Sequence, residues 1–240
     1  MRILTVNVNT TQSMTESIVE AARAVAEPGV EVVGLTPSFG APSCEGNMES
    51  YLAAVGIMDA VLAYEEPFDA VIQAGFGEHG REGLQELLDQ PVVDITEAAA
   101  SMATFVGRSY SVVTTLDRTV PLIEDRLRLA GLMERCASVR ASNTSVLDLE
   151  RDETAAIQSI VDEAKQAIAE DRAETIVLGC GGMAALESAV REQCGVPVVD
   201  GVAAAVTVAQ SLVRLGLRTS KSRTYARPLP KELKGFPLGR

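Results

Sequence analysis

The sequence predicts an α/β protein of two pseudo-symmetric lobes with parallel sheets and a ligand cleft between them. Strand and helix patterns alternate along most of the chain, which is typical of parallel sheets with right-handed crossovers. The chain also repeats itself. Residues 90–94 (QPVVD) recur almost letter for letter as residues 196–200 (VPVVD), and residues 69–75 match residues 174–180 in pattern. The repeat places Gly75 and Cys180 at equivalent positions, facing each other across the cleft.

Each element is expected from its hydrophobic period. Short apolar runs predict strands at residues 2–8, 31–35, 69–74, 91–94, 110–114, 137–141, 175–178 and 196–200. Amphipathic patterns predict helices at residues 11–25, 47–63, 81–88, from 96, from 120, 152–169, 183–192 and 201–215. Asp94 and Asp200 follow strands and are expected to cap the next helices. We assign residues 1–94 plus 201–240 to the first lobe and residues 95–200 to the second.

Composition excludes several classes of protein. The chain has 240 residues, 47% of them hydrophobic, and its formal net charge is −12. Such a chain has enough apolar material for a folded core, and its acidity argues against a nucleic-acid partner. No apolar run could span a bilayer, and the N-terminus lacks the layout of a signal peptide. We therefore expect a cytoplasmic protein that binds a small molecule and not a membrane.

The cysteine pattern argues against a metal site. The chain has four cysteines without CxxC spacing and a single histidine. Zinc sites need several such ligands at short spacings, so no metal ligands are predicted. Free thiols in a reducing compartment are the simplest interpretation, and Cys136 and Cys194 are interpreted as structural.

Cys180 is the strongest candidate for chemistry. It follows the apolar strand 175–178 and precedes Gly181, Gly182 and the helix expected from Met183. Ligands of open α/β sheets bind at such strand-to-helix turns. A helix N-terminus would also lower the thiol pKa and favour a thiolate. The alternative is a cysteine that merely fills space in the core.

Other polar residues end strands at the same predicted edge. Asn7, Asn9, Thr114 and Thr115 carry amides and hydroxyls that suit a planar ring with alternating C=O and N–H groups. Backbone N–H groups of Gly181 and Gly182 are candidate oxyanion donors, and those near Gly75 and Phe76 could serve the opposite side. The alternative for these residue types is turn or capping chemistry.

Several motifs together resemble the hydantoin racemase branch of the aspartate/glutamate racemase superfamily, to which allantoin racemase also belongs. They lie at residues 7–11, 42–46, 75–80, 178–183, 197–200 and 219–221. The resemblance covers nearly the whole chain. It implies two α/β lobes with a site between them, no cofactor, and inversion of a carbon acid by two cysteines, one on each face.

The chain departs from this family at one position. The first family cysteine falls on Gly75, whereas the second falls on Cys180. A lone cysteine opposite a glycine also resembles arylmalonate decarboxylase, a relative that protonates one face after losing carbon dioxide. This departure bears on racemisation by two bases. It bears less on the fold or on the carbon-acid chemistry that the resemblance implies.

Three residues could replace the missing base. His79 is the only histidine and titrates in the useful pH range. Cys44 lies in the Pro/Gly-rich loop expected to cover the cleft, although a free cysteine is also a small hydrophobe. Glu78 lies at an expected helix start, where an acidic residue stabilises the helix dipole without any catalysis. We expect His79 or Cys44 on the Gly75 side.

The best interpretation is a cofactor-independent racemase of a cyclic amide, such as a 5-substituted hydantoin or an allantoin-like compound. One alternative is a single-cysteine decarboxylase or isomerase of a small carboxylate. Another is a non-catalytic binding protein. The C-terminal segment from Arg218 carries seven Lys/Arg and one Glu. It is interpreted either as an arm over the acidic body, at a subunit contact of a homo-oligomer, or as a loose tail.

Overall fold

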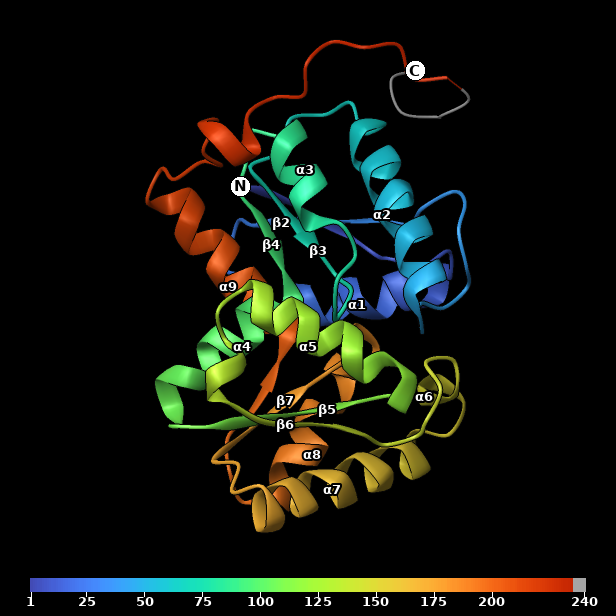
Figure 1. The fold of residues 1–240 in the computed structure, drawn as a ribbon, viewed down its shortest axis with the longest axis vertical. Coiled ribbons are helices and arrows are strands. Elements are labelled where there is room, and N and C mark those ends of the chain that lie inside the picture. The colour runs from blue at the N-terminus through green and yellow to red at the C-terminus, as the bar shows by residue number, and fades with distance from the viewer. Residues whose placement is uncertain (235–240) are drawn as a thin grey trace.

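The computed structural model describes residues 1–234 and contains two sheets of four parallel strands (Figure 1). The first sheet has the order β2-β1-β3-β4 and the second β6-β5-β7-β8. The strands are β1 (Arg2–Val6), β2 (Glu31–Leu35), β3 (Ala70–Gln73), β4 (Val92–Asp94), β5 (Tyr110–Thr114), β6 (Cys136–Ala141), β7 (Thr175–Leu178) and β8 (Val198–Asp200). The predicted α/β class with two lobes is confirmed, while the residue boundaries of the lobes stay a prediction.

Helices connect the consecutive strands, one between most pairs and two between β6 and β7. They are α1 (Gln12–Val25), α2 (Asn47–Leu62), α3 (Arg81–Leu87), α4 (Ile95–Val106), α5 (Val120–Leu129), α6 (Asp148–Arg151), α7 (Glu153–Glu170), α8 (Glu187–Cys194) and α9 (Gly201–Arg214). Short 3₁₀ helices are η1 (Asp117–Thr119), η2 (Met133–Arg135), η3 (Gly181–Leu186) and η4 (Arg223–Tyr225). Within residues 1–234, no helix is long and apolar enough to cross a membrane.

The internal repeat is visible in the strand order. Adding four to each strand number of the first sheet gives the order of the second, so β3 corresponds to β7 and β4 to β8. Registers agree as well: Gln73 is the partner of Asp94, and Leu178 is the partner of Asp200. The sequence pairs that suggested the repeat are therefore structurally equivalent.

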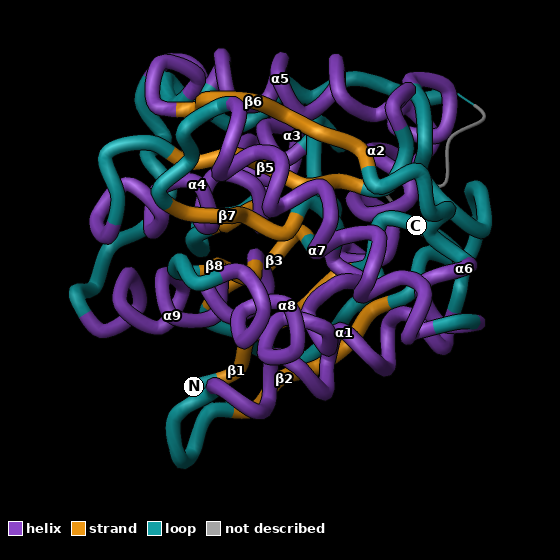
Figure 2. Tube along the Cα trace, turned by 90° about the horizontal axis from the view of Figure 1, so that it is seen from below, coloured by secondary structure: helices purple, strands orange, loops and turns teal. Residues whose placement is uncertain are grey.

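Each sheet lies between two layers of helices. Helices α1 and α9 pack on one face of the first sheet, and α2 and α3 contact it from the other side. Helices α7 and α8 cover the outer side of the second sheet (Figure 2), whereas α4 and α5 pack on its inner side. Helices α1, α4, α5 and α9 contribute to one continuous core that also contains β1, β3, β5 and β7. The inner helices thus join the two sheets into one body.

Both predicted aspartate caps are confirmed. The Asp94 side chain accepts a hydrogen bond from the backbone N–H of Glu97 at 2.8 Å, and Asp200 accepts one from Ala203 at 2.7 Å. The helix predicted from Met183 is different: η3 occupies residues 181–186, and the α-helix begins only at Glu187.

The described part of the C-terminal segment is attached to the first lobe. Thr219 donates from its backbone N–H to the carbonyl of Asp89 at 3.0 Å, and Lys221 contacts the carbonyls of Gln85 and Glu86 at the end of α3. Arg227 forms an ion pair with Asp89 at 2.6 Å. For residues 218–234, these contacts favour the interpretation as an arm that lies over the body of the protein. Residues 235–240 lie outside the described part of the chain.

Candidate active site

One small cavity collects most of the predicted site residues. Its lining includes Asn7, Asn9, Cys44, Gly75, Phe76, His79, Thr114, Thr115, Cys180, Gly181 and Gly182. The predicted candidate Glu78 is not among its lining residues. The cavity measures about 40 Å³, which is room for a few water molecules. A ligand built on a five-membered ring therefore requires the cavity to widen.

The loops after β3 and β7 meet at this cavity. Both strands end at the carboxyl edge of their sheets, where ligands of parallel sheets bind. A Cβ atom placed on Gly181 would lie 2.9 Å from the carbonyl oxygen of Ala74, so the two loops touch at their backbones. Gly75 and Cys180 consequently line the same cavity from equivalent positions in the two halves of the chain.

Burial dominates the titration of Cys180. The side chain is half-buried, and η3 follows it directly. Desolvation raises the pKa of the thiol to about 11, and the backbone N–H of Gly182, which hydrogen-bonds the sulfur, offsets only part of this rise. The prediction of a lowered pKa was wrong, because a short 3₁₀ helix stabilises the thiolate less than burial destabilises it.

A neighbouring side chain fills the space beside Gly75. A Cβ atom at position 75 would lie 2.5 Å from Cδ2 of His79 and 2.4 Å from a methyl carbon of Val8. Such distances are not tolerated, so any larger residue at position 75 requires His79 and Val8 to move. The imidazole of His79 thus stands where a side chain of residue 75 would begin.

His79 is held as a neutral imidazole. Its Nδ1 lies 3.0 Å from Oγ of Ser50, and its Nε2 lies 3.4 Å from the carbonyl oxygen of Phe76. A carbonyl can only accept, so Nε2 carries the proton and Nδ1 accepts from the serine hydroxyl. Burial lowers the pKa of His79 to about 4. The basic nitrogen therefore faces Ser50.

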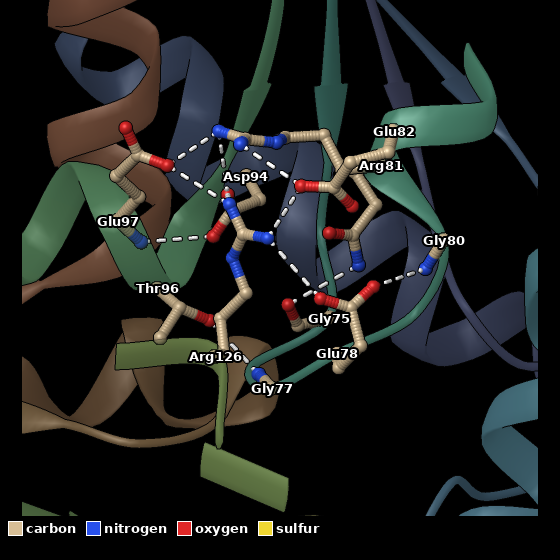
Figure 3. Close-up of polar contacts among 11 residues, drawn as sticks. Gly75, Gly77, Glu78, Gly80, Arg81, Glu82, Asp94, Thr96, Glu97 and Arg126 are labelled. Atoms are coloured by element: carbon tan, nitrogen blue, oxygen red, sulfur yellow. Dashed lines mark hydrogen bonds and ion pairs between the residues drawn. The ribbon is translucent and has the colours of Figure 1, made fainter. Parts of the chain in front are cut away.

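The two other base candidates occupy different surroundings. The Cys44 thiol lies in the cavity wall, 3.8 Å from the carbonyl oxygen of Val8, and burial raises its pKa to about 12. Glu78 is not a cavity-lining residue, and Figure 3 shows its carboxylate between Arg126 and the backbone of Gly80. One of its carboxylate oxygens accepts from the backbone N–H of Gly80 at 2.9 Å, and the other pairs with Arg126 at 3.1 Å.

The polar residues at the strand ends are largely occupied by local contacts. The Asn7 amide donates to Oδ1 of Asn9 at 2.9 Å and lies 3.0 Å from Oγ1 of Thr15. The Thr114 hydroxyl donates to the carbonyl oxygen of Gly179 at 2.9 Å. Asn7 thus shapes the cavity wall through contacts close in sequence, whereas Thr114 joins the end of β5 to the end of β7. Thr115 lines the cavity and is buried.

Sequence reasoning missed the apolar part of the lining. Val8, Met14, Ile18 and Val146 complete the cavity wall, and Met14 and Ile18 come from the buried face of α1. Their helical period indicated a core face, and nothing local distinguished core from site. A larger groove of about 940 Å³ lies among α1, α4 and α9, but none of the predicted site residues lines it.

Three comparisons place this geometry in context. Residues 3–209 match the family described as Asp/Glu/Hydantoin racemase. The chain is 39% identical to a hydantoin racemase of Paenarthrobacter aurescens over 97% of this chain and 99% of that relative. It is 71% identical to the allantoin racemase of Pseudomonas fluorescens, whose crystal structure superimposes with a TM-score of 0.97 over 98% of this chain and 100% of that one.

A second solved structure agrees. The allantoin racemase of Klebsiella pneumoniae is 42% identical, with a TM-score of 0.94, over 98% of this chain and 96% of that one. The family match spans most of the chain, and the structural likeness covers nearly all of it. The protein therefore belongs to the Asp/Glu/Hydantoin racemase family and is a racemase.

Proposed function

We propose that this racemase interconverts the enantiomers of a cyclic amide, either allantoin or a closely related 5-substituted hydantoin. The observation that carries the proposal is the cavity in which Cys180 lies opposite Gly75 and His79, at equivalent strand ends. The 71% identity to an allantoin racemase supports allantoin as the first substrate to test.

The chemistry asks for one proton-transfer group on each face of the stereocentre. In a hydantoin ring, the reacting carbon lies beside a carbonyl, so loss of its proton places negative charge on the carbonyl oxygen. Cys180 serves one face, as acid in the thiol form and as base in the thiolate form. The backbone N–H of Gly181 is the candidate donor to the developing oxyanion.

The group that serves the second face of the stereocentre is expected on the Gly75 side of the cavity. His79 is nearest to position 75, but its basic nitrogen must turn from Ser50 before it can accept a proton. Cys44 is already in the cavity wall as a thiol and suits the role of acid. Glu78 lies three residues from Gly75, and its side chain must leave Arg126 to reach the cavity.

The first experiment tests Cys180. Cys180→Ala should reduce racemisation of both allantoin enantiomers by about 10²- to 10⁴-fold, because a side chain that transfers the proton typically contributes a factor in this range. Cys194→Ala is the matched control, since Cys194 lies on α8 and is not among the cavity-lining residues, and should stay within twofold. Polarimetry measures the rates. Undiminished turnover in Cys180→Ala would remove this thiol from the mechanism.

The second experiment assigns the opposite face. Racemisation in deuterated water should incorporate deuterium mainly into the inverted product from both enantiomers if two groups act. His79→Gln, Cys44→Ala and Glu78→Gln then identify the second group, since its variant alone should lose inversion while Cys180 still exchanges hydrogen with retention. Exchange with retention in the unmodified protein would instead mean a single base.

The glycine at position 75 is also compatible with an alternative function, that of a decarboxylase. A cysteine paired with a glycine at the equivalent position also suits protonation of one face after loss of carbon dioxide from a substituted malonate. Carbon dioxide release from an arylmalonate, without racemisation of allantoin or hydantoins, would favour that decarboxylase. Ligand binding with neither reaction would favour a binding protein. The homo-oligomeric state and the cytoplasmic location stay predictions.

A further inference from the structure

Arg126 is an arginine buried among four carboxylates. It lies on α5, and its side chain is only 1% exposed. Its guanidinium contacts Glu78 at 3.1 Å, Glu82 at 2.7 Å, Asp94 at 3.1 Å and Glu97 at 2.9 Å. Figure 3 shows it at the centre of these partners, which come from α3, from the loop before it and from the β4–α4 junction.

The cluster depends on its cations. Arg81 joins it through Glu82, Asp94 and Glu97, so two guanidinium groups face four carboxylates. Asp94 is fully buried, and desolvation raises its pKa despite both arginines. Without Arg126, three or more carboxylates would share one partly buried site with a single cation, which is strongly unfavourable.

The same cluster holds the loop that enters the cavity. Glu78 joins Arg126 to the backbone N–H of Gly80, and the hydroxyl of Thr96 accepts from the backbone N–H of Gly77 at 2.8 Å. Gly77 and Gly80 have φ angles of 121° and 80°, which only glycine adopts without strain. Residues 75–80 therefore have a specified shape, and this shape presents Gly75, Phe76 and His79 to the cavity.

Helix α5 forms the other side of this contact. It follows the segment 114–119, whose threonines line the cavity from the second sheet. A Cβ atom on Gly77 would lie 3.7 Å from Leu122 and 3.9 Å from Ile123, so the loop rests on α5. Arg126 follows one turn later and ties the helix to the loop by ion pairs.

We propose that Arg126 is a positioning residue for the reaction: it sets the position of the loop 75–80 relative to the threonine-bearing wall of the cavity. Arg126 does not line the cavity, so it acts through Glu78 and the loop and not on the substrate itself. The kinetic part rests on the proposed racemase function. Small displacements of a catalytic loop reduce the rate greatly, because proton transfer requires near-contact geometry.

The test compares Arg126→Met and Arg126→Lys with Arg140→Met. Arg140 is the control: it contacts three carboxylates, Asp171, Glu170 and Glu163, where Arg126 contacts four, and it lies on β6 and is not a cavity-lining residue. Arg126→Met should lower kcat for both enantiomers at least tenfold, with a smaller change in KM. Arg126→Lys should recover part of kcat because it keeps the charge. Arg140→Met should keep kcat within twofold.

Hydrogen exchange supplies a readout that needs no substrate. In folded Arg126→Met and Arg126→Lys, peptides covering residues 75–80 should exchange at least fivefold faster than in the unmodified protein, whereas peptides from α7 should not change. Arg126→Lys decides the matter if Arg126→Met does not fold. If the exchange of residues 75–80 were unchanged in the variants, the proposal would be overturned, whether or not the protein had racemase activity. In an active enzyme, faster exchange of this loop with an unchanged kcat would also overturn it.

Discussion

Two opposing effects act on the thiol of Cys180. The backbone N–H groups at the start of η3 favour a thiolate, and desolvation disfavours it more strongly, so the pKa rises to about 11. At neutral pH the resting side chain is therefore a thiol, which is the form that donates a proton. Under the proposed mechanism, the first turnover of a resting molecule would then require a base on the Gly75 side.

His79 makes the folded protein sensitive to acid. Its pKa falls from 6.5 in the unfolded chain to about 4 in the buried site, so the unfolded state binds the proton more readily. Stability is full above pH 6.5 and declines as pH falls toward 4, by about 2 kcal/mol between pH 7 and pH 5. Urea unfolding at these two pH values measures the decline. His79→Gln should flatten it, and an unchanged slope would contradict the buried neutral imidazole.

The first residue of the short helix η3, Gly181, lies against the opposite loop. Gly181 comes so near Ala74 that a Cβ atom would lie 2.9 Å from a backbone oxygen, which cannot rotate away. Gly181→Ala should therefore destabilise the protein by about 1–3 kcal/mol and displace the loop that carries Cys180. Thermal unfolding measures this effect.

Gly182→Ala is the control for the stability measurement. Its nearest new contact would be 3.4 Å from a side-chain methyl group of Leu149, so it should be nearly neutral. Equal effects of the two substitutions would show that backbone proximity at position 181 is not the cause.

The elements that the sequence predicted well have strong local signals. The repeated PVVD segments fixed β4 and β8, and their aspartates cap the next helices as expected. The failures arise from contacts distant in sequence. The helix predicted from Met183 begins only at Glu187, after η3, whose first residue Gly181 packs against Ala74 in the other half of the chain. The thiol pKa of Cys180 depends on burial, which the local turn does not encode.

Arg126 was missed for a similar reason. In the sequence it stands beside Glu124 and Asp125 in an amphipathic helix, which is the usual pattern of a solvated face. Its partners lie up to 48 residues away, at Glu78, and only the packing of α5 on the first half of the chain brings them together. A pattern within one helix cannot distinguish such a buried cation from an exposed one.

At the scale of the whole molecule, one hydrogen bond beside the cavity joins the first half of the chain to the second. The backbone N–H of Val146, a cavity residue, donates to the carboxylate of Glu45 at 3.1 Å. Glu45→Ala should raise the equilibrium constant for opening of the cavity by about tenfold. The reason is that a hydrogen bond to a charged group contributes about 1.5 kcal/mol, and this bond is lost in the variant. The alkylation rate of Cys180 without ligand, measured by mass spectrometry against Cys194 as internal reference, should rise accordingly.

Glu45→Gln is the matched control, since the amide oxygen can still accept from Val146. It removes the charge that helps to raise the pKa of the Cys180 thiol, as Glu45→Ala also does, so its alkylation rate shows the effect of the charge alone. Glu45→Ala should react faster still, because it also loses the hydrogen bond to Val146. If the rate for Cys180 were the same in Glu45→Ala and Glu45→Gln, this bond would not restrict the opening of the cavity.

The small size of the cavity, about 40 Å³, also affects the time course of binding. A protein that must widen before a ring can fit shows an apparent dissociation constant larger than the intrinsic one by the reciprocal of the open fraction. An open fraction of about one in a hundred weakens apparent binding about a hundredfold. At high ligand concentration, the observed rate constant for association would level off at the rate constant for opening of the cavity. Opening of the protein, and not diffusion of the ligand, would then limit the rate of binding.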